Sequence, residues 1–227
     1  MKKKFLCIIA ALALLLIFPL SGCGGSDDTA EIEATVNGFM TAMQEGDLEG
    51  MKEYADPAIF EENGSLSEFS TIENMDEELA EAVGVDVSAL SDTTKDAVNK
   101  YVNKMLQNLV TAYEITEVTE TDDGVGKVKV TTTYGFDPEK GEEIDVNDEI
   151  EAMTTEYMTE NMSELTQIYS TGGQEALMSK VLDDMAGQIL DLYADAIMQT
   201  GEVTQDSVFT VENKDGKWLI TAEDALE

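Results

Sequence analysis

Residues 113–136 read YEITEVTETDDGVGKVKVTTTYGF, and at Tyr113 the apolar period of the preceding residues, that of a helix, changes to that of a strand. Val128, Val130, Thr132 and Tyr134 recur at every second position of 126–136, which is the period of a strand with one buried face. Residues 113–121 alternate in the same way, and Asp122-Asp123-Gly124 is typical of a turn. The stretch therefore predicts an antiparallel β-hairpin.

A second hairpin is predicted at the end of the chain. Its strands cover 203–212 and 217–222, and Asn213-Lys214-Asp215-Gly216 supplies the turn. Trp218 and Ile220 share one face of the last strand, so that face is expected to be buried.

Residues before the first hairpin follow the helical period. Apolar residues spaced for one helix face predict a helix over 29–45, which Gly46 ends. Asp47 is placed to cap a short second helix, and Asp56-Pro57 breaks it. After it we expect a polar loop over 61–70, a helix over 71–83 closed by Gly84, a turn over 85–91, and a helix over 92–112.

Two long helices are expected between the hairpins, over 146–169 and 174–199. Gly172-Gly173 separates them, so they should form an antiparallel helical hairpin. One α+β domain over 29–227, with a two-helix insertion at about 145–200, is the simplest reading of this order.

The first residues have the pattern of a secretory signal. Lys2 to Lys4 precede an apolar run over 5–20, which is too short to cross a bilayer comfortably. Leu20-Ser21-Gly22-Cys23 resembles the lipobox of bacterial lipoproteins. The resemblance implies a signal peptide over 1–22, cleavage between Gly22 and Cys23, a diacylglyceryl group on the Cys23 thiol, and a tether over 23–28. An ordinary signal with a chance cysteine, or an uncleaved anchor, remains the alternative.

The charge of the chain excludes one class of partner. The net charge is −35, and the sequence contains no arginine and no histidine. Because nucleic-acid binding needs clustered cations, it is not expected here. The acidic surface also repels anionic lipids, so acyl chains on Cys23 would have to hold the protein at the bilayer. Cys7 lies in the apolar run, so the mature domain would have no disulfide, which is compatible with a Gram-positive surface.

Two further stretches resemble NTF2-like domains. VNGFMTAMQEGDLEGMKEYAD (36–56) is similar to their opening helices, and NKDGKWLI (213–220) is similar to their last hairpin. The resemblance implies N-terminal helices packed on a curved antiparallel sheet that forms a cone with a pocket. The long helices at about 145–200 depart from that pattern, and we expect them to cover or replace the mouth of the pocket.

Catalysis in such a pocket would need acid–base groups. Some NTF2-like enzymes use an aspartate base with tyrosine or protonated-aspartate donors. Five tyrosines fall at predicted inward positions: Tyr54, Tyr101, Tyr113, Tyr134 and Tyr157. Each can equally be a core residue whose hydroxyl finds a partner. No single base stands out among the carboxylates, so we assign no catalytic residue.

A calcium-loop pattern is present but incomplete. Asp145, Asn147, Glu149 and Glu156 occupy positions one, three, five and twelve, whereas position six, which needs glycine, is Ile150. An acidic first helical turn, capped by Asp145 or Asn147, is the preferred interpretation. We assign no metal ligand and no cofactor.

Methionines are concentrated in the two long helices. They are Met153, Met158, Met162, Met178, Met185 and Met198. Met153 and Met185 fit the inward stripes, whereas Met158 and Met162 lie off the main stripe of their helix and could therefore be exposed. These side chains form either an ordinary helix–helix core or an exposed groove that adapts to apolar partners.

The sequence thus predicts a non-catalytic lipoprotein at the outer face of the bacterial cytoplasmic membrane. We expect it to bind an apolar small molecule or another envelope protein, with its ligand-binding residues not identified. An extracytoplasmic enzyme using Asp and Tyr groups, and a structural surface protein without ligand, are the alternatives.

Overall fold

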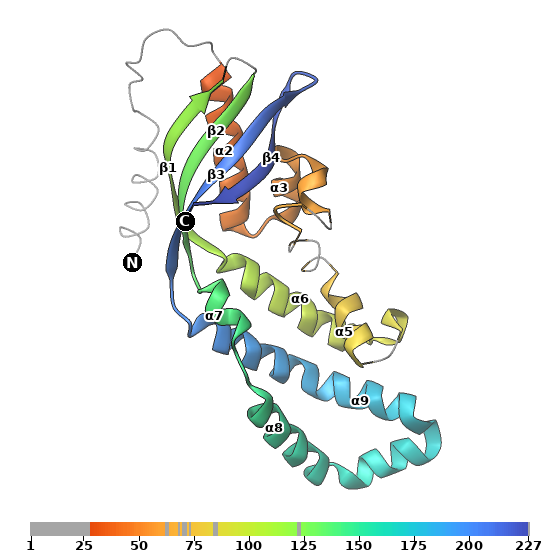
Figure 1. Cartoon of the computed structure of the whole chain (residues 1–227). Helices are drawn as coiled ribbons and strands as arrows, with labels where there is room; N and C mark the ends of the chain where they lie inside the picture. Colours follow the sequence, from red (N-terminus) through yellow and green to blue (C-terminus); the bar gives the residue numbers. More distant parts are fainter. Residues whose placement is uncertain are drawn as a thin grey trace, which may run out of the picture.

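Four antiparallel strands form one sheet, in the order β1-β2-β3-β4 (Figure 1). The computed structural model describes residues 28–226 except 62–63, 68, 70–71, 73, 84–85 and 122–123. The strands are β1 (Val110–Glu120), β2 (Val125–Tyr134), β3 (Val203–Lys214) and β4 (Lys217–Ala225). Both predicted hairpins are confirmed, and pairing of β2 with β3 joins them into a single sheet. The α+β class is therefore confirmed.

Helix α2 (Asp28–Glu45) packs on one face of this sheet and supplies six of the buried residues of the core. Ile32, Val36 and Phe39 are completely buried, and the ring of Phe39 lies 5.8 Å from that of Phe209 on β3. On β2, a Cβ at Gly126 would lie 2.7 Å from Cγ2 of Ile32, so only glycine permits this approach. Side chains therefore fill the space between α2 and the sheet.

Helix α3 (Leu48–Tyr54) begins at the predicted cap, where Asp47 accepts a hydrogen bond from the Gly50 amide at 2.9 Å. The helix ends before Asp56-Pro57, as predicted, and the 3-10 turn η1 (Pro57–Phe60) follows. The Asp56 amide donates to the Ile220 carbonyl at 2.8 Å, and the Asp56 carboxylate pairs with Lys214. This segment is thereby attached to the β3–β4 hairpin.

The loop predicted over 61–70 is confirmed at residues 61 and 64–67, which form bends and turns, but the prediction that it is polar is wrong. Leu66 is buried, and the Phe69 ring meets Phe60 edge-on, with centroids 6.5 Å apart. Helix α5 (Met75–Val83) covers the later part of the helix predicted over 71–83, whereas Gly84 lies outside the described residues. The turn η2 (Val87–Ala89) follows.

Helix α6 (Asp92–Gln107) is shorter than the predicted 92–112. Val110 is buried and pairs with Tyr134 as the first residue of β1. The amide of Gly135 donates to the carbonyls of Asn108 and Leu109, at 3.1 and 3.2 Å. The pairing with β2 and these two bonds end the helix, although the apolar spacing of the sequence continues to Val110.

The insertion between β2 and β3 contains α7 (Pro138–Glu142), α8 (Asn147–Glu160) and α9 (Met162–Met198). The helix predicted over 146–169 is wrong as one helix, because it is interrupted at Asn161, whose side-chain amide donates to the Tyr157 carbonyl at 2.9 Å. The predicted break at Gly172-Gly173 is confirmed as a kink inside α9, where Gly173 has φ 74°.

Helices α6 and α9 run side by side in the same direction. Lys100 pairs with Asp191 at 3.0 Å and Lys104 with Asp195 at 2.7 Å. A step of four residues along α6 thus corresponds to a step of four residues in the same direction along α9. The two helices lead into β1 and β3, which flank β2. Figure 1 shows that the start of α2 and the turn between α8 and α9 lie at opposite ends of the molecule.

We predict that Phe39→Ala lowers the free energy of unfolding by about 3–5 kcal/mol, because it leaves a cavity between α2 and the sheet. Urea denaturation followed by circular dichroism measures the change. Tyr169→Ala, which removes an aromatic ring that is 57% exposed, is the matched control and should change stability by less than about 0.5 kcal/mol. Equal effects of the two substitutions would contradict the position of the core.

Candidate functional site

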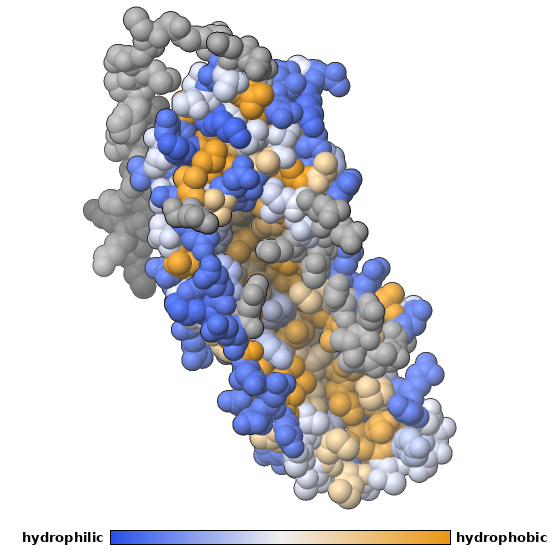
Figure 2. Space-filling view, viewed as in Figure 1, coloured by the Kyte–Doolittle hydropathy of each residue, from blue (hydrophilic) through white to orange (hydrophobic). Residues whose placement is uncertain are grey.

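A groove of about 760 Å³ lies between α8 and the first part of α9. Its apolar walls come from both helices: Ile150, Met158, Met162, Leu165, Tyr169 and Leu177. In Figure 2, apolar surface runs along the lower part of the molecule, where Figure 1 places these helices. The groove is therefore in the insertion and not between α2 and the sheet, where the resemblance implies a pocket.

Three large apolar side chains of the groove are exposed, whereas Leu165 is buried. Met158 is 46%, Met162 63% and Tyr169 57% exposed, and α8 has no buried residue among its fourteen. The off-stripe positions of Met158 and Met162 are confirmed as exposed, whereas Met185 is buried and Met153, Met178 and Met198 are half-buried. A helix without buried residues gains little from packing on its own chain, so its apolar side chains are available to a partner.

Two threonines of the groove wall, Thr159 and Thr166, need no hydrogen bond from a ligand. The hydroxyls of Thr159 and Thr166 each donate to the carbonyl four residues earlier, both at 2.7 Å. Because these polar groups are satisfied inside their helices, they add little to the cost of covering the groove with an apolar group.

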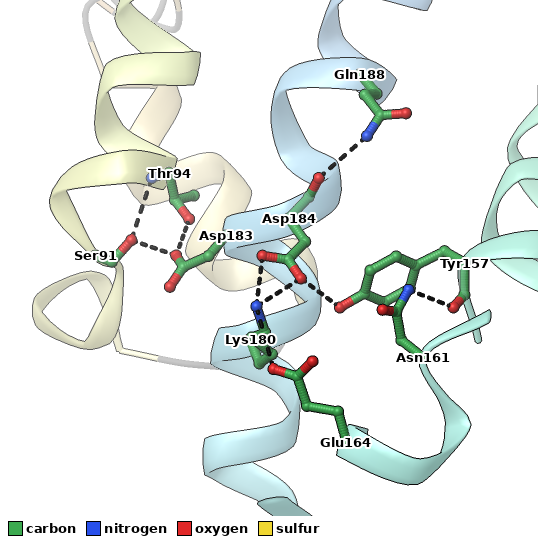
Figure 3. Close-up of polar contacts among 9 residues, drawn as sticks. All are labelled: Ser91, Thr94, Tyr157, Asn161, Glu164, Lys180, Asp183, Asp184 and Gln188. Atoms are coloured by element: carbon green, nitrogen blue, oxygen red, sulfur yellow. Dashed lines mark hydrogen bonds and ion pairs between the residues drawn. The ribbon is translucent and has the colours of Figure 1, made fainter. Parts of the chain in front are cut away.

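Polar contacts hold the two walls of the groove in place (Figure 3). The Tyr157 hydroxyl on α8 donates to Oδ2 of Asp184 at 2.7 Å. Lys180 pairs with Asp184 at 2.8 Å and reaches Glu164, in the first part of α9, at 3.7 Å. Side chains from α8 and from both sides of the Gly173 kink thus converge on Asp184 and Lys180.

These contacts shift the ionisation of the groups that make them. The hydrogen bond from Lys180, followed by that from Tyr157, lowers the pKa of Asp184. The pKa of Tyr157 is raised, first by burial and then by its bond to the Asp184 carboxylate. At neutral pH the pair is therefore a neutral phenol that donates to a carboxylate.

Asp183 faces the opposite side of α9, toward α6. Its Oδ1 accepts from the hydroxyl of Ser91, the residue that caps α6, and from that of Thr94 at 2.8 Å. Thr94 is almost completely buried. The spacing of the sequence gives no indication of this contact, because about ninety positions separate the partners.

The five predicted inward tyrosines do not form one site. Tyr54, Tyr113 and Tyr134 are half-buried against the core of α2 and the sheet. Tyr101 lies on α6, where burial and nearby Tyr193 raise its pKa. Tyr157 meets a carboxylate network, and its hydroxyl donates to Asp184. The hydroxyls of Tyr113 and Tyr157 are hydrogen-bonded, to the side chains of Asn37 and Asp184.

The incomplete calcium pattern lies at the start of α8. Asp145 accepts from the backbone and side-chain amides of Asn147, at 3.0 and 2.7 Å, so it satisfies the first helical turn. Ile150 lies within α8 and lines the groove. In the part of the chain that the structure describes, no three carboxylate or thiol side chains are placed to hold a metal ion.

The predicted lipidation site falls outside this description. Gly22, Cys23, the signal peptide over 1–22 and the tether up to residue 27 are not among the described residues. No helix among residues 28–226, with the gaps given above, has both the length and the apolar character to span a bilayer. Comparison of the chain with protein-family models, curated proteins and solved structures finds no match.

We predict that Tyr157→Phe lowers the free energy of unfolding by about 1–2 kcal/mol, the worth of a hydrogen bond to a charged group that is partly solvated. Urea titration measures the loss, and Tyr169→Phe, which changes an exposed tyrosine, should have no effect.

The same loss should depend on pH. Because the pKa of Asp184 is lowered from 3.8, its contribution is complete above that value and disappears as the pH falls through the lower folded-state pKa. The difference between wild type and Tyr157→Phe should thus be constant from pH 5 to pH 8 and shrink below about pH 4. A constant difference down to pH 2 would show that Asp184 is not the partner.

Proposed function

We propose that the protein is a non-catalytic, lipid-anchored lipoprotein of the bacterial cell surface that binds an apolar partner group in the groove between α8 and α9. The observation that carries this proposal is the exposure of Met158, Met162 and Tyr169 along a groove whose walls are fixed by Tyr157 and Asp184. Exposed apolar surface of this kind is typical of an interaction site. Methionine side chains suit it because they adapt to different apolar shapes.

We further infer that α2, α3 and the sheet form an NTF2-like scaffold. This inference is supported by two helices packed on one face of an antiparallel sheet, and by the positions of Trp218 and Ile220, both buried on β4. Register shifts occur in β1 between Ile115 and Glu117 and in β4 between Ile220 and Ala222, and such irregularities increase the twist and bend of a sheet. In this proposal the binding function belongs to the inserted helices.

The lipid anchor is proposed from the residues at the start of the chain. Lys2 to Lys4, the apolar run and Leu20-Ser21-Gly22-Cys23 support it. Two acyl chains on Cys23 would give stable attachment, which a chain with a net charge of −35 needs at an anionic bilayer.

We predict that Cys23→Ser moves the protein from the membrane pellet to the soluble or secreted fraction, or leaves it as an unprocessed precursor of higher mass. Cell fractionation with immunoblotting, and mass spectrometry of the N-terminus, measure both results. Ser21→Ala, which keeps a small residue before the cysteine, is the control. A Cys23→Ser protein of unchanged mass that still pellets with membranes would contradict the anchor.

We predict that the groove binds an uncharged apolar dye such as Nile red. Dye fluorescence should rise on titration with the purified protein in detergent-free buffer, and Met158→Ser with Met162→Ser should weaken binding about tenfold, since two apolar contacts are removed. Leu226→Ser is the control, because Leu226 and Met158 are both 46% exposed. Equal loss in the control, or no binding by wild type, would contradict a binding groove.

A further inference from the structure

We propose that the partner of the groove is a cationic amphipathic helix, with its apolar stripe on Met158, Met162 and Leu177 and its Lys or Arg side chains against the acidic edge of α8. This inference deepens the proposed function and rests on it. Three observations support it: the walls of the groove are helical, the residues around the groove are acidic, and a second hollow lined by carboxylates lies beside it.

The walls of the groove consist of helix, which restricts the conformation of the partner. The lining residues belong to α8 and α9, whose interior N–H and C=O groups are bonded within each helix. The walls therefore offer no free strand edge on which an extended peptide could add a strand. A peptide that covers this apolar surface must satisfy its own backbone groups, and a helix does so.

The charge of the insertion has one sign over a long stretch. Between Lys140 and Lys180 the sequence has no basic residue. The acidic side chains exposed over the same stretch are Glu143, Asp145, Asp148, Glu149, Glu151, Glu156, Glu160, Glu164 and Glu175. A negative field of this kind raises the association rate of a cationic partner and favours one orientation of that partner.

A second hollow of about 440 Å³ gives these charges a defined place beside the groove. Asp148, Glu151 and Glu156 line it, together with Ala152 and Thr155. Glu151 and Thr155 line the groove as well, so the two hollows lie on adjacent sides of α8, with these two residues between them. A helix with its apolar side chains in the groove would thus carry cationic side chains on one flank into this acidic hollow.

Charge disfavours the other occupants of an apolar groove. Two copies of a chain with net charge −35 would bring acidic edges together, and an anionic bilayer would be repelled in the same way. An uncharged small molecule would fill the groove but leave the acidic hollow unused. A cationic amphipathic helix is the occupant that makes use of both features.

Three synthetic peptides of about 18 residues, roughly 27 Å as helices, test the proposal. The first has leucines at helical spacing on one face and lysines elsewhere. The second keeps the leucines and replaces lysine with glutamate, and the third scrambles the first. Fluorescence anisotropy is measured with the purified wild-type protein at about 150 mM salt, which screens diffuse attraction between distant charges.

We expect the first peptide to bind at least about tenfold more tightly than either of the others. Met158→Ser with Met162→Ser should remove this preference over the scrambled peptide. Glu151→Gln with Glu156→Gln should weaken binding of the first peptide about tenfold. The control Glu33→Gln with Glu45→Gln makes the same change of charge on exposed positions of α2 and should weaken it by less than about twofold.

Three results would overturn the proposal. Equal binding of the scrambled peptide would mean that charge alone attracts the peptides. Equal binding of the glutamate peptide would mean that the charge of the peptide does not affect its binding. Equal loss in the α2 control would mean that the acidic hollow is not the cationic site. If these results occur while the groove still takes up Nile red, the inference about the partner fails and the binding groove stands.

Discussion

Two neighbouring carboxylates on α9, Asp183 and Asp184, hold its long helix between α6 and α8. Asp183 accepts from Ser91 and Thr94 at the start of α6, whereas Asp184 accepts from Tyr157 on α8 and pairs with Lys180. Successive residues of a helix point about 100° apart, so one position on α9 can serve both neighbours. The shape of the groove depends on this position, because α8 has no buried residue that would otherwise fix it.

Several lysines form ion pairs that join different helices and strands of this acidic chain. Lys100 and Lys104 pair with α9, Lys129 joins β2 to β1, and Lys214 joins β3 to Asp56. Exposed pairs of this kind contribute about 0–1 kcal/mol each, so their main effect is to set which elements face each other. The stretch between Lys140 and Lys180, which contains the groove, has no basic residue of its own, although Lys180 reaches Glu164 within it.

Much of the scaffold was predictable from local pattern. The period-two spacing of Val128, Val130 and Thr132 indicated β2, and Asp47 and Gly173 marked helix boundaries that the structure has. The end of α6 was not predictable from period alone, because Val110 continues the helical stripe and only its pairing with Tyr134 places it in a strand. Asn161, which interrupts the predicted helix, is polar but not a strong breaker.

The candidate site was predictable only in part. The off-stripe positions of Met158 and Met162 indicated that they could be exposed, and they are. The expectation of a pocket under the sheet did not identify the groove, because Phe39 and Phe209 fill the space between α2 and β3. Contacts such as that of Thr94 with Asp183 join residues far apart in sequence, and a single sequence contains no local signal for them.

The opposite placement of the start of α2 and the α8–α9 turn (Figure 1) has a geometric consequence for attachment at Cys23. Residues 24–27 leave only a short link between Cys23 and Asp28, so the sheet would stand next to the bilayer and the insertion would point outward. Residues 174–198 of α9 alone are roughly 37 Å long, so with the proposed attachment the groove would lie beyond the lipid headgroups. The protein would then act as a stalk that meets its partner out in the cell wall space.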